Sequence, residues 1–209
     1  MAVTIKYQSQ LADHTISSYT QQWATAYGDL VQASNIEELY SFFGGIDTSN
    51  NKIVLAGFKS HYESEAVIIG GTLMGDDGKM ASGNYIQSLE FGKSLVPNSD
   101  NTTKYLEQVQ LRVDGLNIDG DFYNSVCSLS RAMRAESGNP YQDGVDQGIY
   151  NLLRGNADPL LEVLTAKGID VNTPLKDMAI ASQFEVMASD MPTIDTVGVV
   201  ESSDMLLAA

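Results

Sequence analysis

The chain has 209 residues, of which 43% are hydrophobic, so it can bury the core of one large domain. Its 27 acidic and 12 basic residues give a formal net charge of −15, which argues against nucleic acid or anionic membrane as a partner. Cys127 is the single cysteine, so no disulfide can form within the chain. No apolar stretch approaches the roughly 20 residues that a membrane helix needs, and no secretory signal peptide is expected at the N-terminus.

The first half of the chain predicts a strand, a helix and more strands. Residues 3–7 alternate apolar and polar side chains, as a strand does. A helix follows, because apolar residues recur at steps of three and four: Ile16, Tyr19, Trp23 and Tyr27. Thr15 or Ser17 can cap its start, and Gly28 can end it. Further strands are expected at 52–58, 66–69, 85–91 and 105–113, with irregular segments at 29–51 and 70–84.

The second half predicts helices and an acidic tail. Asp158-Pro159 and Thr173-Pro174 each place a capping residue and a proline ahead of an apolar run, so each predicts a helix start. No element is predicted for 114–147. The order favours an α+β class, with helices packed on one face of a curved antiparallel sheet in a single domain, 1–183. No Lys or Arg follows Lys176, and residues 184–209 are expected to form a flexible acidic tail.

Two short motifs do not support a catalytic or metal site. Gly92-Lys93-Ser94 lacks the upstream glycine and the following helix of a phosphate-binding loop. The acidic stretch 114–121 does not fit the spacing of a calcium-binding EF-hand and is interpreted as a surface turn. The chain also lacks the common hydrolase motifs, so an enzyme is not expected.

Five stretches are specific enough to compare with known families: the segment 16–29 with its Trp23, the segments 70–73, 86–92 and 147–156, and the closing Leu206-Leu207-Ala208-Ala209. Together they resemble the HasA hemophore family of secreted bacterial haem carriers. The resemblance implies the same α+β fold, with one haem b held between two loops, here 30–45 and 72–84. It also implies secretion by an ABC-type exporter that reads the C-terminal tail. Outside the cell, such a protein takes haem, often from haemoglobin, and delivers it to an outer-membrane receptor.

The positions that bind iron in the family carry other residues here. The resemblance places the first-loop histidine at Gln32, the second-loop tyrosine at Gly75 or Met74, and its partner histidine at Met80. Thioether is a softer ligand than phenolate, although methionine is an axial haem ligand in cytochromes. We therefore predict Met80 or Met74 as the iron ligand, with Gln32 as a distal contact. Both methionines also fit hairpin residues packed on the sheet.

Other residues are expected to border the haem. Tyr40 is a tyrosine of the first loop, and Tyr150 and Leu153 match a helix face that borders haem in the family, although their spacing also fits core residues. Apolar surface is also expected from Leu39, Phe42 and Phe43, whereas Tyr85 is expected to be a sheet residue. The alternative function is a secreted paralogue that has lost haem ligation and binds a receptor or another protein.

Overall fold

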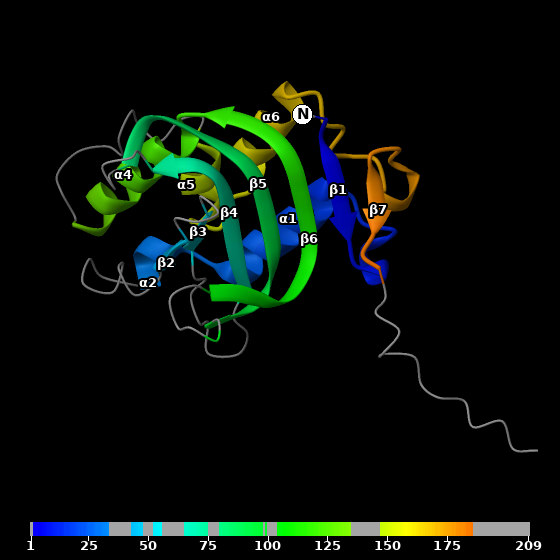
Figure 1. Ribbon diagram of the computed structural model, residues 1–209, viewed down its shortest axis with the longest axis horizontal. Coiled ribbons are helices and arrows are strands. Elements are labelled where there is room, and N and C mark those ends of the chain that lie inside the picture. The colour runs from blue at the N-terminus through cyan, green and yellow to red at the C-terminus, as the bar shows by residue number, and fades with distance from the viewer. Residues whose placement is uncertain are drawn as a thin grey trace, which may run out of the picture.

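The computed structural model describes residues 2–33, 43–47, 52–55, 65–74, 80–97, 99, 104–134 and 147–185 (Figure 1). Its strands are β1 (Thr4–Tyr7), β2 (Phe43–Asp47), β3 (Lys52–Leu55), β4 (Glu65–Met74), β5 (Met80–Pro97), β6 (Lys104–Asp119) and β7 (Ala181–Gln183). Its α-helices are α1 (Ile16–Tyr27), α2 (Leu30–Ala33), α4 (Asp121–Met133), α5 (Gly148–Leu152) and α6 (Asp158–Ala166). Two short 3-10 helices are η1 (Ser9–Leu11) and η3 (Leu175–Asp177).

The strands form one seven-stranded sheet in the order β2-β3-β4-β5-β6-β1-β7. Neighbouring strands are antiparallel except β1 and β7, which pair in parallel. The long strands β4, β5 and β6 follow one another as a meander, and Figure 1 shows them curving together around the helices. This arrangement confirms the predicted α+β class.

Helix α1 follows the prediction closely. The Thr15 side chain accepts a hydrogen bond from the Ser18 amide at 2.9 Å, so Thr15 is the N-cap, and Gly28 follows the last turn with φ +80°. Trp23 is 2% exposed and stacks on Tyr27 with ring centroids 4.8 Å apart. It also meets the edge of Phe91 on β5 at 5.3 Å. The helix therefore packs its aromatic face directly on the centre of the sheet.

The prediction of an irregular segment at 70–84 is wrong for its first and last residues, which belong to strands. Residues 70–74 continue β4, and residues 80–84 belong to β5. Gly71 lies where β4 approaches β5 so closely that a Cβ would overlap the carbonyl oxygen of Tyr85. Glycine at this position therefore does not indicate a loop. It is required because the two strands pair so closely here.

The segment 114–147 contains an unpredicted helix. The acidic stretch interpreted as a surface turn is instead the end of β6 and the start of α4 at Asp121. The helix predicted after Thr173-Pro174 is only the three-residue η3. Helix α6 is confirmed, with Pro159 in its first turn, but its N-cap is Ala157 rather than Asp158.

The two faces of the sheet differ in chemistry. The face toward the helices carries the main core, which includes Ile69, Leu89 and Val113. The opposite face carries a forked pair between Arg112 and Asp114, with Nε–Oδ2 and Nη2–Oδ1 distances of 2.6 and 2.9 Å. No helix within the described ranges is long and apolar enough to cross a membrane.

Candidate haem site

The described start of the first loop is a short helix directly after α1. Residues 30–33 form α2, and the Gln32 side chain on it is exposed. Leu30 is 3% exposed, and its amide donates to the carbonyl oxygen of Leu153 at 2.9 Å. Part of the predicted loop 30–45 is therefore regular: α2 covers its start, and β2 begins at Phe43.

Of the two residues predicted to border the haem at this helix, Tyr150 lies in α5 and Leu153 follows its last residue. Tyr150 is 5% exposed and Leu153 is fully buried, and both belong to the main core cluster. Beside them, Arg154 donates two hydrogen bonds to the Asp29 carboxylate, with Nε–Oδ1 and Nη2–Oδ2 distances of 2.7 and 2.8 Å. The same guanidinium donates to the Tyr150 hydroxyl at 2.9 Å. The hydrogen bonds that Arg154 donates to Asp29 are the main cause that raises the pKa of its guanidinium.

A buried polar network on α4 fixes the start of α5. The Asp121 carboxylate accepts from the amides of Gly148 at 2.6 Å and Ile149 at 3.0 Å. Ser125 donates to the same carboxylate at 3.1 Å and accepts from the Tyr150 amide at 2.9 Å. Burial raises the pKa of Asp121, and these hydrogen bonds oppose part of that rise. Because the α5 amides have no partners within their own helix, α4 provides their caps.

The two predicted iron ligands lie opposite each other in the sheet. Met74 is the last residue of β4, Met80 is the first of β5, and the two are register partners across this hairpin. Residues 75–79 between them, including the alternative ligand position Gly75, lie outside the described residues. Helix α4 contacts both α2, which carries Gln32, and β5, which begins with Met80.

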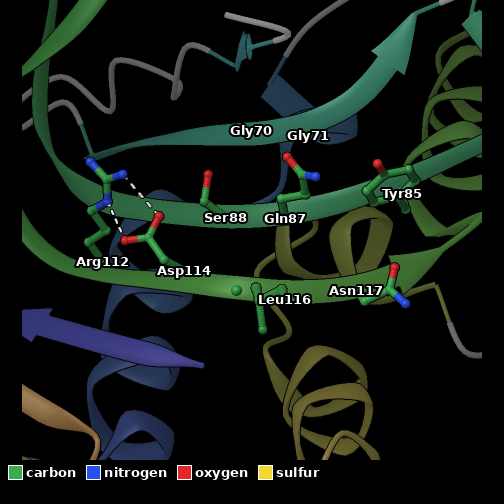
Figure 2. A pocket seen from close by; sticks show the side chains of 10 residues that line it. Gly70, Gly71, Tyr85, Gln87, Ser88, Arg112, Asp114, Leu116 and Asn117 are labelled. Atoms are coloured by element: carbon green, nitrogen blue, oxygen red, sulfur yellow. Dashed lines mark hydrogen bonds and ion pairs between the residues drawn. The ribbon is translucent and has the colours of Figure 1, made fainter. Parts of the chain in front are cut away.

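A groove lies on the other face of the sheet. It has a volume of about 660 Å³ and is lined by β4, β5 and β6. Figure 2 shows Tyr85, Gln87 and Ser88 along its length, with Arg112 and Asp114 at one end. Tyr85 is therefore a strand residue at this groove, as the sequence predicts. Gln32, Tyr150 and Leu153 do not line it.

Several predicted residues are not placed by the structure. Tyr40, Leu39 and Phe42 lie outside the described residues, and Phe43 is described only as the first residue of β2. Across the described ranges, no group of three or more His, Cys, Asp or Glu residues could hold a metal ion. The sequence analysis missed Asp29, Arg154, Asp121 and Ser125, because their contacts join positions far apart in the chain and no local motif marks them.

Comparison with known proteins covers the whole chain. The family model described as Heme-binding protein A (HasA) matches residues 1–209. Hemophore HasA of Serratia marcescens is 26% identical over an alignment 207 residues long, and the match covers 93% of this chain and 98% of that protein. The tetragonal apo structure of the hemophore HasA from Yersinia pestis is 29% identical with a TM-score of 0.62, over 89% of this chain and 98% of that one. The holo structure of the hemophore HasA from the same organism is 30% identical with a TM-score of 0.63, over 88% of this chain and 100% of that one.

Proposed function

Because this chain belongs to the HasA family of haem-binding proteins, we propose that it is a hemophore that binds haem b and carries it outside the cell to an outer-membrane receptor. The observation that supports this role most strongly is the family match over all 209 residues. The fold similarity to a holo hemophore supports it further. The proposed role is transport, without chemical conversion of the haem.

The proposed haem site lies between the first loop and the β4–β5 hairpin. Tyr150 and Leu153, which are buried in the core at the C-terminal end of α5, would support the apolar side of the site, and Gln32 would be a distal contact. Met80 or Met74 would bind the iron, since a thioether is an established axial ligand of haem. A site of this kind depends more on burial of the porphyrin than on the iron bond, because apolar burial contributes roughly 25 cal/mol per Å² whatever the axial ligand.

Titration with hemin tests the proposed function directly. We expect a saturable change in the Soret band at one equivalent of hemin per chain. Iron-free protoporphyrin IX, titrated in parallel, should bind almost as well, because its ring buries the same apolar surface. A protein that binds neither porphyrin would contradict the hemophore proposal and favour the paralogue that has lost haem.

We also propose that residues 184–209 direct export through an ABC-type exporter. The support is compositional: this segment contains no Lys or Arg and carries acidic residues up to Asp204. The first residue of this segment is tied to the sheet, because the Phe184 amide donates to the carbonyl oxygen of Tyr7 at 2.9 Å. Deleting 196–209 should leave a folded protein inside the producing cell, and normal export of that truncation would contradict the proposal.

A further inference from the structure

Arg154 joins two parts of the chain that are 125 residues apart. Its guanidinium binds both carboxylate oxygens of Asp29 and, through Nη1, the Tyr150 hydroxyl. Such a forked, charge-assisted pair is among the stronger hydrogen-bonded contacts in proteins, and its planar geometry fixes direction as well as distance. The side chains of Arg154 and Asp29 are 31% and 16% exposed, so the pair is largely shielded from water.

The backbone around Asp29 is tied to the same point. Oδ1 of Asp29 also accepts from the Val31 amide at 2.9 Å, while the Leu30 amide is bound to Leu153. Gly155 has φ +82°, and a Cβ there would lie only 3.4 Å from the carbonyl oxygen of Gly28. Residues 28–31 therefore rest closely on the C-terminal end of α5.

We propose that Arg154 is a positioning residue that holds residues 28–31 against the C-terminal end of α5, and so places Gln32 at the proposed haem site. This inference rests on the proposed function. Gln32 follows directly after this fixed segment, and its side chain is exposed, so it is available as the proposed distal contact. A contact residue whose backbone is already held in place loses less conformational freedom on binding a ligand, and the bound ligand leaves more slowly.

The matched control is the other forked pair, between Arg112 and Asp114. Its two nitrogen–oxygen distances are 2.6 and 2.9 Å, close to those of the Arg154 pair, but it lies on the opposite face of the sheet. In the full chain, Arg154→Gln and Arg112→Gln thus each remove one forked arginine–aspartate pair, but on different sides of the sheet. Hemin association and dissociation are measured by stopped flow, and amide hydrogen exchange is followed residue by residue.

For Arg154→Gln we expect hemin dissociation to become about tenfold faster, the size expected for loss of a charge-assisted hydrogen bond. Exchange of the Leu30 and Val31 amides should accelerate, while exchange within α1 stays unchanged. Arg112→Gln should alter none of these. Equal acceleration of all amides in Arg154→Gln would indicate a merely structural role and overturn the proposal.

A second variant separates this proposal from protein stability and from the proposed function. Tyr150→Phe keeps the buried ring and removes only the hydroxyl that Arg154 binds, so hemin dissociation should become about two- to threefold faster. Unchanged dissociation in both Arg154→Gln and Tyr150→Phe, with wild-type binding intact, would overturn the role of Arg154 alone. A wild-type protein that binds no hemin would instead overturn the proposed function and the inference that rests on it.

Discussion

The two sides of the proposed haem site are built in different ways. On the helical side, formed by α1, α2 and α5, side chains such as Trp23, Tyr150 and Arg154 are held by packing and by specific hydrogen bonds. On the hairpin side, Met74 and Met80 are register partners at the end of two strands. Strand pairing uses backbone groups, so it tolerates a change of side chain there. We infer that the fold constrains the helical side strongly, whereas the hairpin side is free to vary with its iron chemistry.

The largest expected effect comes from the centre of the helical side. Trp23→Ala removes a 2% exposed indole that contacts both Tyr27 and Phe91, so the free energy of unfolding should fall by about 3–5 kcal/mol. Urea denaturation followed by far-UV circular dichroism measures this loss. A loss below about 1 kcal/mol would show that the contacts of Trp23 contribute little to the fold.

Trp23→Phe is the matched control for this position. The buried Nε1 of Trp23 has no hydrogen-bond partner within the described part of the chain. Phenylalanine therefore removes no hydrogen bond, and it retains an aromatic ring beside Tyr27. Its cost should be well below that of Trp23→Ala; an equal cost would mean that the loss comes from something other than ring packing.

The next largest effect is expected at the α4–α5 junction. Asp121→Ala leaves the buried Gly148 and Ile149 amides without their acceptor, which should cost about 1–3 kcal/mol of unfolding free energy. Asp114→Ala is the control, since Asp114 accepts a comparable pair of bonds from Arg112 on the more exposed face of the sheet. Its loss should be about 1 kcal/mol or less. Equal losses in the two variants would contradict the inference that burial makes the contacts of Asp121 more important for stability.

The raised pKa of Asp121 predicts how the stability of the protein changes with pH. Burial raises its pKa in the folded state, so the folded protein holds this proton more tightly than the unfolded chain. Its contribution to stability is therefore fully present below the ordinary aspartate pKa and is lost as the pH rises through the raised pKa. Asp121→Asn cannot titrate, so the stability advantage of wild type over this variant should shrink across that window. An advantage that grows with pH would show that the pKa is lowered instead.

The sequence predicted α1 well because all its signals are local. Thr15 caps the start, Gly28 follows the end, and the buried face is plainly apolar. Helix α4 had none of these: Gly120 offers no side-chain cap, and its buried residues include Asp121, Ser125 and Ser128. These polar groups are acceptable inside only because α5 and the segment before it bind them, a contact that no local pattern reveals.

The residues around the proposed haem site were predicted unevenly for a similar reason. The segments 16–29 and 147–156 resemble the family, and they contain Asp29 and Arg154. The pairing between those two residues depends on tertiary structure, so spacing alone does not show it. At the hairpin, glycine and turn-forming residues suggested a loop, although residues 70–74 and 80–84 pair as strands.

The smallest effect on stability, and the most specific effect on function, is expected at the hairpin. Met80→Leu and Met74→Leu conserve volume, so each should change the free energy of unfolding by less than about 1.5 kcal/mol. In wild type, reduction of the iron should strengthen haem binding, because a thioether is a soft ligand that suits Fe(II) better than Fe(III). The variant that removes the true ligand should lose this preference for ferrous haem and still bind iron-free protoporphyrin IX as wild type does. If neither variant changes the preference, the iron is not held by Met74 or Met80, and a ferric tyrosinate spectrum would then direct attention to Tyr40 or Tyr85.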